Sequence, residues 1–283
     1  MRQVAIVTGA TRGIGKACAL SLARQGFDVV VTGRTQKEGE GTATLPFSRE
    51  GQQVAVPGSL ETTVAAVQAA GRKVLPVRMD VLDRNSMDAV IAQTLERWGR
   101  IDVLVNNALY QGPGLMHAFA DFSFEQFEKS VLGNLVNQAY MTRGVLPVMI
   151  RQGGGCIVSL SSNAAVSPPP APPDKGGWGF VYGAPKAGFH RIAEFIHVEH
   201  AKDGIVAFNV EPGFTVTEAT VAMFGANAAA DFSRDATRPE TTGDVVAWLV
   251  TRPEAKALAG TLISSPGFFA ARGIVFPWAR PCC

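Results

Sequence analysis

Short apolar runs rich in β-branched residues alternate with helical patterns along almost the whole chain. The runs predict strands at residues 4–8, 28–32, 74–79, 103–106, 156–160, 205–210 and 261–264. Helices are expected between them, near residues 14–25, 59–70, 84–98, 123–150, 183–202 and 242–251. Apolar strands separated by helices indicate a parallel sheet that is covered on both faces. We therefore expect an α/β fold with a doubly wound parallel sheet of about seven strands, and ligands at the carboxyl ends of these strands.

Length and composition fit one domain over residues 1–283 and argue against several other classes of protein. At 47% hydrophobic and 18% charged residues, the chain can bury a large core. A formal net charge of +2, carried by scattered basic residues, does not suggest a nucleic-acid surface. No apolar run approaches the ~20 residues that span a bilayer, and a strand beginning by Gln3 leaves no room for a signal peptide. Cys18, Cys156, Cys282 and Cys283 lack metal-ligand spacing. The chain therefore reads as a soluble cytoplasmic protein with no metal site.

Two segments interrupt the alternation. Residues 35–58 are rich in Gly, Thr, Ser and Gln, and form a long irregular connection before a helix that Ser59 could cap and Gly71 could end. Residues 167–177 are rich in proline, which lacks the N–H donor, and so exclude a helix or a central strand. This spacing also permits a polyproline ligand for a partner domain. Its place between two candidate active-site residues favours a loop beside a pocket.

The first strand runs directly into a glycine-rich turn and a helix. Gly9 permits a tight exit from the strand, while Gly13 and Gly15 let the backbone approach a pyrophosphate and let the helix pack on the sheet. The N-terminus of that helix offers unpaired N–H groups and a favourable dipole to phosphates. The spacing is Gly-x-x-x-Gly-x-Gly rather than the commoner Gly-x-Gly-x-x-Gly. An ordinary strand–helix turn needs fewer glycines, so the segment predicts dinucleotide binding on a Rossmann-type sheet.

The end of the second strand bears on the choice between NAD and NADP. An acidic residue here would accept a hydrogen bond from the ribose 2′-hydroxyl of NAD, but the position holds Gly33, followed by Arg34. Arg12, inside the glycine turn, can reach the same region. Two guanidinium groups suit a 2′-phosphate, so the pair favours NADP. Asp80, after the third strand, could accept from the adenine amino group or simply begin a loop.

Tyr182 and Lys186 stand four residues apart, shortly after Ser161 and Ser162. On a helix this spacing places the phenol and the ammonium on one face. A neighbouring ammonium favours the phenolate, lowers a pKa that is ~10 when unperturbed, and lets a tyrosine exchange protons near neutral pH. The alternative is an exposed tyrosine beside a surface lysine, because chance produces many such pairs.

Taken together, these motifs resemble the short-chain dehydrogenase/reductase family, in its single-domain soluble branch. The matching positions, in the family's order and nearly its spacing, are residues 8–15, 80, 106–108, 134, 161–162, 182, 186 and 212–213. The resemblance runs from residue 3 to about residue 218, and implies hydride transfer between NADP(H) and a carbonyl or secondary alcohol. It also implies the residues that contact NADP, which are Gly9, Thr11, Arg12, Gly13, Ile14, Gly15, Arg34, Asp80, Val81, Asn107, Ala108, Tyr182, Lys186, Pro212, Gly213 and Thr217.

The resemblance implies a catalytic set of four residues, Asn134, Ser162, Tyr182 and Lys186. Tyr182 would be the general acid in reduction and the base in oxidation, with its pKa lowered by Lys186. Ser162 would hold the substrate oxygen, while Ser161 could instead point into the fold. Asn134 would fix a water that links the lysine to solvent. The long helices 123–150 and 183–202 commonly form dimer faces in the family, which implies a homo-oligomer, either a dimer or a tetramer.

The chain also departs from the family pattern. Leu109 and Tyr110 follow Ala108 where glycine is usual, and should narrow the floor of the substrate site. Pro185 lies within the motif, which is tolerable if it falls in the first helical turn, where its missing N–H is not needed.

Seven residues are expected to border the substrate, namely Leu109, Tyr110, Trp178, Phe180, Phe214, Met223 and Phe224. None is charged, which favours an uncharged small-molecule ketone or secondary alcohol as the substrate. Some of these aromatic side chains could simply pack a loop onto the core. Two other functions stay open at this point. One is a nicotinamide-binding regulator without catalysis, and the other is an interaction protein that uses the proline-rich loop.

Overall fold

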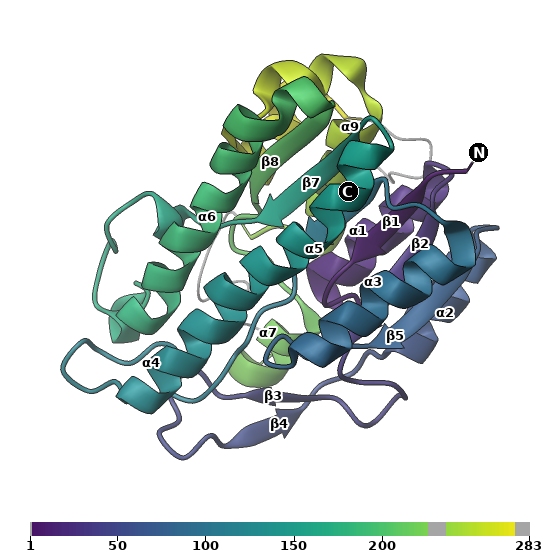
Figure 1. Cartoon of the computed structure of the whole chain (residues 1–283). Helices are drawn as coiled ribbons and strands as arrows, with labels where there is room; N and C mark the ends of the chain where they lie inside the picture. The colour runs from purple at the N-terminus through teal and green to yellow at the C-terminus, as the bar shows by residue number, and fades with distance from the viewer. Residues whose placement is uncertain (1, 226–235, 275–283) are drawn as a thin grey trace.

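Seven parallel strands form the central sheet of the computed structural model, which describes residues 2–225 and 236–274. In sheet order they are β5 (Val74–Arg78), β2 (Asp28–Gly33), β1 (Val4–Val7), β6 (Val103–Asn106), β7 (Gly155–Leu160), β8 (Ile205–Glu211) and β9 (Leu262–Ser264). The predicted fold and all seven strands are confirmed, each within one residue of its expected bounds. The chain order reverses between β1 and β6, and ligands bind outside the carboxyl ends of strands at such a point (Figure 1).

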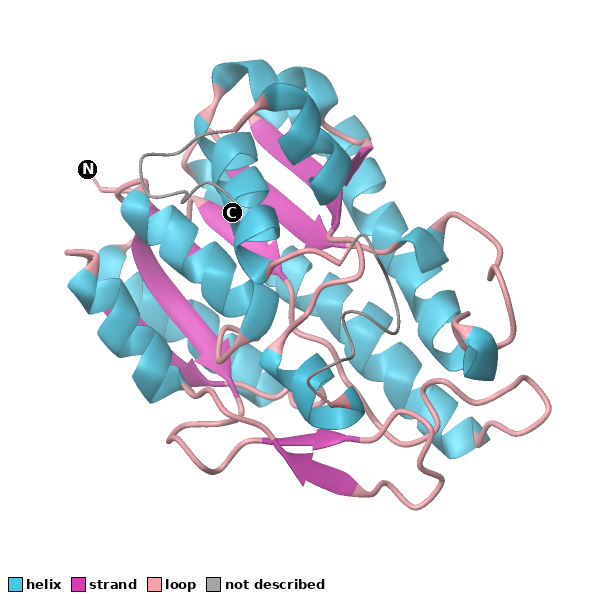
Figure 2. Cartoon of the chain, turned by 180° about the vertical axis from the view of Figure 1, so that it is seen from behind, coloured by secondary structure: helices cyan, strands magenta, loops and turns pink. Residues whose placement is uncertain are grey.

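Helices cover both faces of the sheet (Figures 1 and 2). One face carries α1 (Gly13–Arg24), α2 (Leu60–Ala69) and α9 (Pro239–Thr251). The other carries α3 (Arg84–Trp98), α5 (Asn137–Arg151) and α6 (Phe180–His200). Successive strand residues face opposite layers, because the side-chain period of a strand is two. In β1, for example, Val7 belongs to the core under α1 and α9, and Ile6 to the core under α3 and α5.

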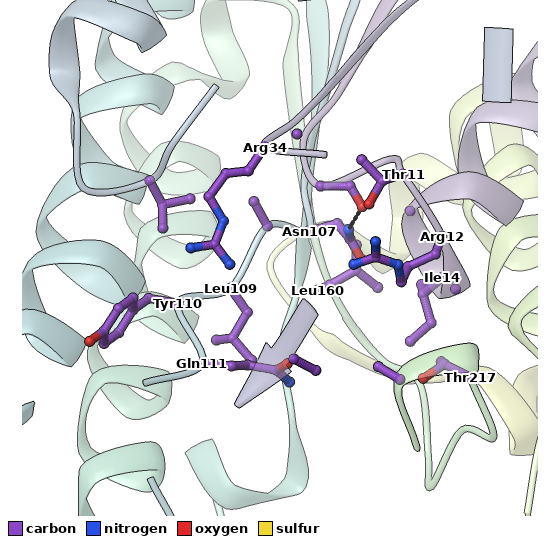
Figure 3. Close-up of a pocket in the computed structure, with 18 of the residues that line it drawn as sticks. Thr11, Arg12, Ile14, Arg34, Asn107, Leu109, Tyr110, Gln111, Leu160 and Thr217 are labelled. Atoms are coloured by element: carbon purple, nitrogen blue, oxygen red, sulfur yellow. Dashed lines mark hydrogen bonds between the residues drawn. The ribbon is translucent and has the colours of Figure 1, made fainter. Parts of the chain in front are cut away.

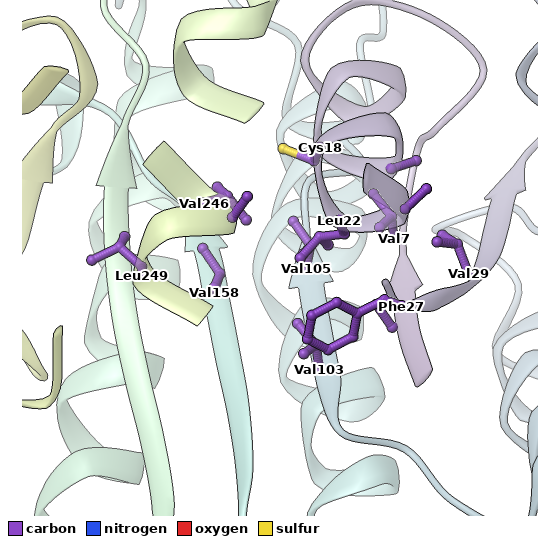
Figure 4. Packing of buried hydrophobic residues seen from close by; sticks show 14 of the residues in the cluster. Val7, Cys18, Leu22, Phe27, Val29, Val103, Val105, Val158, Val246 and Leu249 are labelled. Atoms are coloured by element: carbon purple, nitrogen blue, oxygen red, sulfur yellow. The ribbon is translucent and has the colours of Figure 1, made fainter. Parts of the chain in front are cut away.

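The core under α1 and α9 fixes the position of the glycine-rich turn. Figure 4 shows Cys18 and Leu22 of α1 beside Val105 of β6, with Val246 of α9 close by. All four side chains have less than 1% of their surface exposed. The burial of Cys18 and Leu22 fixes α1 against the sheet. Its N-terminus is thereby held at the carboxyl end of β1, where the predicted phosphate site lies.

The helix expected over residues 123–150 is interrupted. It consists of α4 (Phe124–Val131), a π-helical turn η1 (Leu132–Val136) and α5. The turn holds Asn134, one of the predicted catalytic residues. Single π-helical turns inside α-helices occur often at functional sites, because the extra residue redirects neighbouring side chains.

Helix α6 begins at Phe180, three residues before the predicted start, which corrects the expectation for Pro185. This proline is the sixth helical residue and therefore lies beyond the first turn. Its missing N–H leaves the carbonyl of Val181 without the usual partner from four residues further on. Ser130 of α4 fills that role, since its Oγ donates to the Val181 carbonyl at 2.9 Å.

The irregular connection at residues 35–58 contains a two-stranded antiparallel hairpin, β3 (Thr42–Thr44) and β4 (Gln53–Ala55). It lies at the carboxyl edge of the main sheet against α7 (Glu218–Phe224) (Figure 1). The predicted cap is confirmed, because Ser59 Oγ accepts from the N–H of Thr62 at 3.1 Å at the start of α2.

The remaining elements are short. They are α10 (Ser265–Arg272) and the 3-10 turns η2 (Asn163–Ala165), η3 (Pro173–Lys175), η4 (Ala201–Asp203) and η5 (Pro253–Leu258). Within residues 2–225 and 236–274, no helix is long and apolar enough to cross a membrane. Cys282 and Cys283 lie outside the described residues.

Candidate active site

A cavity of about 310 Å³ opens where the carboxyl ends of β1, β2 and β6 meet the N-terminus of α1, and it is called the strand-end cavity here (Figure 3). All of the predicted cofactor contacts line it except Asp80 and Gly213. The Asp80 carboxylate accepts from the N–H of Leu82 at 3.0 Å, as in the loop-starting alternative. The hairpin supplies Thr42, Ala43 and Thr44 to the same wall, which the sequence did not predict.

The glycines of the turn allow the close approach that a diphosphate needs. Gly9 and Gly13 have φ values of 66° and 53°, which side chains rarely adopt. A Cβ atom on Gly15 would lie 2.2 Å from the carbonyl oxygen of Gly9. Asn107 stabilises the turn, because its Nδ2 donates to the carbonyls of Thr8 and Gly9 at 2.8 and 3.1 Å. The bare backbone at the start of α1 therefore fits the pyrophosphate of a dinucleotide.

A carboxylate already contacts this helix N-terminus. Glu218, the first residue of α7, accepts from the N–H of Gly13 at 2.9 Å through Oε2. An anion is favoured at this point by the unpaired N–H groups and by the helix dipole. Sequence reasoning missed Glu218, although it directly follows the predicted contact Thr217.

The two predicted arginines play different parts. Arg12 donates to the hairpin side of the cavity, with Nε to the Pro57 carbonyl at 2.8 Å and Nη2 to the Gly58 carbonyl at 2.7 Å. Burial lowers its pKa. Arg34 is exposed, lines the cavity, and forms no hydrogen bond or ion pair with the described residues (Figure 3). Arg12 is thus largely an anchor for the hairpin, while the guanidinium of Arg34 is available to a ligand.

Tyr182 and Lys186 line the strand-end cavity, and Ser162 lies beside Tyr182. The Ser162 hydroxyl forms a hydrogen bond with the Tyr182 phenol. Lys186 is 8% exposed, and its Nζ donates to the carbonyl of Leu160 at 2.6 Å. Ser161 points into the fold, where its Oγ lies 2.9 Å from Nδ1 of His190. Of the two serines, Ser162 therefore faces Tyr182.

Burial shifts the pKa values of both candidate catalytic groups. It raises the pKa of the Tyr182 phenol above its usual value, and the Ser162 hydrogen bond acts in the opposite direction. It lowers the pKa of the Lys186 ammonium to about 8. The expected lowering of the Tyr182 pKa by Lys186 is therefore wrong for this arrangement, because loss of hydration outweighs the favourable contacts.

Asn134 is buried and uses its side chain to hold the neighbouring loop. Its Oδ1 accepts from the N–H of Tyr110 at 2.7 Å, and its Nδ2 donates to the Tyr110 carbonyl at 3.0 Å and to Ser130 at 3.1 Å. None of the described residues bridges this amide to Lys186 by a direct hydrogen bond. A link through water stays a prediction.

A second cavity of about 470 Å³ adjoins the first, and it is called the Trp178 cavity here. Tyr182 lines both cavities, and Ser162 lines this one. Residues Pro173, Gly176 and Gly177 bring the proline-rich loop to its wall, which confirms a position beside a pocket.

The structure brings only some of the predicted substrate-wall residues to one cavity. Four of the seven residues line the Trp178 cavity, namely Trp178, Phe214, Met223 and Phe224. Leu109 and Tyr110 line the strand-end cavity instead. Phe180 lines neither cavity, because it packs against Phe122 and Phe127 at ring-centroid distances of 5.8 and 5.2 Å. The wall also contains Glu211, so the expectation of a wall without charge is wrong. Its place directly before Pro212 and Gly213 could have pointed to it.

Comparisons with known proteins agree with this geometry. A family model described as short chain dehydrogenase matches residues 3–61 and 46–227. The chain is 29% identical over 267 residues to a 3-oxoacyl-(acyl-carrier-protein) reductase from Synechocystis, covering 94% of this chain and 96% of that protein. It is 30% identical over 214 residues to an L-rhamnose 1-dehydrogenase (NAD(P)(+)) from a Sphingomonas species, covering 75% and 72% of the two chains. The crystal structure of actinorhodin polyketide ketoreductase with NADPH has a TM-score of 0.73 and 28% identity, covering 93% of this chain and 95% of that one.

Proposed function

Because the chain belongs to the short-chain dehydrogenase/reductase family, and so is an oxidoreductase of alcohols or carbonyl compounds with a nicotinamide cofactor, we propose that it transfers a hydride between NADP(H) and a predominantly apolar ketone or secondary alcohol. The observation that carries this proposal is the position of Tyr182, which lines both the strand-end cavity and the Trp178 cavity. From this position the Tyr182 phenol can protonate the oxygen of a substrate in the Trp178 cavity while a dinucleotide occupies the strand-end cavity.

The side chains around Tyr182 support a proton-transfer role. The nicotinamide, when bound, supplies the hydride in reduction and accepts it in oxidation. The raised pKa keeps Tyr182 protonated at neutral pH, which is the form that a general acid needs. The Ser162 hydroxyl hydrogen-bonds the phenol when no substrate is bound, and its single proton can turn to a substrate oxygen when one is present. Lys186, one helical turn further on, brings a positive charge to the region where the phenolate develops.

The catalytic assignment is tested with Tyr182→Phe, which removes the phenol oxygen and keeps the ring. We expect kcat for ketone reduction to fall by roughly 10²- to 10⁴-fold, the usual contribution of general acid–base catalysis. NADPH binding, measured by fluorescence titration, should be retained. Tyr140→Phe, which changes a partly buried tyrosine on α5 whose hydroxyl donates to Asp88, is the matched control. Full activity in the Tyr182→Phe variant would show that Tyr182 is not the general acid.

We propose that Arg34 produces a preference for NADP over NAD. Gly33 leaves no acid for a ribose hydroxyl, and Arg34 offers a guanidinium without a protein partner among the described residues. The similar ketoreductase solved with NADPH agrees with this proposal, while the NAD(P)(+) in the name of the rhamnose dehydrogenase covers both cofactors.

Cofactor preference is measured as the ratio of kcat/KM with NADPH to kcat/KM with NADH. Arg34→Ala should lower this ratio by roughly 10- to 100-fold, as expected for the loss of a charge-assisted hydrogen bond. Arg12→Ala should instead weaken both cofactors, because it releases the hairpin. Arg143→Ala, at an exposed position on α5, serves as the control. An unchanged ratio in Arg34→Ala contradicts the proposed preference.

A further inference from the structure

Glu211, the last residue of β8, places a carboxylate in the wall of the Trp178 cavity. Only 6% of the residue is exposed. Glu211 and Tyr182 are the two ionisable side chains among the described residues that line this cavity. The other lining residues are uncharged. A carboxylate in such surroundings is costly unless it is hydrogen-bonded.

The described residues hydrogen-bond only one oxygen of this carboxylate. Oε1 accepts from the N–H of Gly213 at 2.8 Å and so fixes the turn after the strand. Oε2 has no hydrogen-bond partner among the residues that the structure describes. A carboxylate accepts at both oxygens, so one acceptor is left for a ligand that fills the cavity.

This carboxylate lines the same cavity as the candidate reacting group, Tyr182. Tyr182 and Ser162 line the same cavity, and the charge of Glu211 is one of the causes that raise the pKa of Tyr182. A substrate whose carbonyl oxygen meets Tyr182 can therefore present its other substituents to Glu211 in the same cavity.

We propose that Glu211 is a specificity residue that accepts a hydrogen bond from an O–H or N–H donor next to the reacting carbon of the substrate. The favoured substrates are then hydroxy ketones or amino ketones, and the matching alcohols, rather than plain apolar ketones. The aromatic wall formed by Trp178, Phe214 and Phe224 holds the apolar part of such a molecule. This inference rests on the proposed reductase function.

Three matched aryl ketones test the inference, namely acetophenone, α-hydroxyacetophenone and α-aminoacetophenone. With NADPH, we expect kcat/KM to be roughly 10-fold or more higher for at least one donor-bearing ketone than for acetophenone, as one hydrogen bond to a charged acceptor implies. The hydroxyl and amino arms show which donor the site prefers. Equal kcat/KM for all three ketones overturns the proposal.

Glu211→Gln separates recognition from a structural role. The amide keeps the shape and an oxygen for the N–H of Gly213, but presents an N–H donor where the free acceptor was. The ratio of kcat/KM for the donor-bearing ketone to kcat/KM for acetophenone should fall by roughly 10-fold. Acetophenone serves as the internal reference, because loss of the Glu211 charge also acts on the pKa of Tyr182 and so affects all three ketones alike. An equal loss of kcat/KM for all three ketones would mean that Glu211 only supports the turn at Gly213. Glu61→Gln, at an exposed position on α2, is the matched control.

A binding measurement keeps the test independent of turnover. Isothermal titration of the protein saturated with NADP⁺ gives the Kd of each ketone. Glu211→Gln should weaken the donor-bearing ketone by a similar factor and leave acetophenone unchanged. If no ketone is reduced but this binding pattern holds, the catalytic proposal fails and the recognition by Glu211 stands. If all three bind alike in the unaltered protein, the recognition fails whatever the activity.

Discussion

At the scale of single residues, burial decides which of the two titratable groups, Lys186 or Tyr182 on α6, loses its proton first as the pH rises. The pKa of Lys186 is lowered to about 8, while the pKa of Tyr182 is raised above its usual value. As the pH rises, the lysine therefore loses its proton before the tyrosine does. At neutral pH the ground state is an ammonium beside a neutral phenol, and the phenolate forms only while the substrate takes the proton.

The pH profile of ketone reduction should reveal this order. Below pH 8 Lys186 carries a positive charge that stabilises the developing phenolate, and above pH 8 it is neutral. We expect kcat for reduction to be level below pH 7 and to decline with a midpoint near pH 8. Lys186→Arg keeps the charge at all these pH values, so any remaining activity should lose this decline. The same midpoint in the variant would assign the titration to another group.

At the scale of elements, a serine on α4 compensates a proline on α6. Ser130 Oγ donates to the Val181 carbonyl, which Pro185 cannot serve, and accepts from Asn134 of η1. The hydroxyl thus joins the helix that carries Tyr182 to the π-helical turn that carries Asn134.

Ser130→Ala should lower the free energy of unfolding by about 1–3 kcal/mol, because it leaves a buried carbonyl without a donor. In a Pro185→Ala background the new N–H can reach Val181, so the same serine substitution should cost less. Urea unfolding of the four proteins in this double-mutant cycle measures the difference. Ser123→Ala is a control, since that exposed side chain makes no capping bond. Equal costs in both backgrounds would mean that Ser130 does not replace the proline donor.

Helix α7 places a carboxylate against the phosphate-binding end of α1. Glu218 accepts from the N–H of Gly13, so a diphosphate that uses this donor must displace the side chain. Glu218→Gln removes the negative charge and should lower the Kd for NADPH by roughly 3- to 10-fold, within the range of charge effects at a helix terminus. Glu240→Gln, an exposed position in the first turn of α9, should leave the Kd unchanged. Weaker NADPH binding in Glu218→Gln would show that the carboxylate supports the bound state.

At the scale of the whole molecule, the elements that depend on local sequence pattern could be predicted, and the contacts between distant segments could not. The strands were predictable because runs such as residues 4–7 are buried on both faces. The glycine turn was predictable because few residues tolerate its backbone. By contrast, the contact of Arg12 with Pro57 depends on a hairpin whose position no local pattern specifies. The place of Glu211 before Pro212 marks it as a strand-end residue, but only the folded wall shows that its side chain lines the Trp178 cavity.

Exposed apolar side chains lie on two elements that contact each other, η1 and α6. Phe195 and Val198 lie three residues apart on α6 and are 63% and 81% exposed. Leu132 and Val136 lie four apart on η1, which contacts α6, and are 37% and 39% exposed. Figure 1 shows α5 and α6 side by side on this surface. Exposed apolar side chains can mark interaction surfaces, and the family resemblance implies that these helices form dimer faces.

A homo-oligomer that buries this surface should be lost when charge is placed on it. We expect the unaltered protein to exceed the 29.9 kDa of one chain in size-exclusion chromatography with light scattering. Combining Phe195→Glu with Val198→Glu should reduce the measured mass to that of one chain, because two buried carboxylates without partners oppose association. Phe124→Glu changes an equally exposed ring on α4 that lies outside the surface, and should leave the mass unchanged. A single-chain mass for the unaltered protein would contradict the predicted oligomer. Association that survives in the double variant would place the interface on another surface.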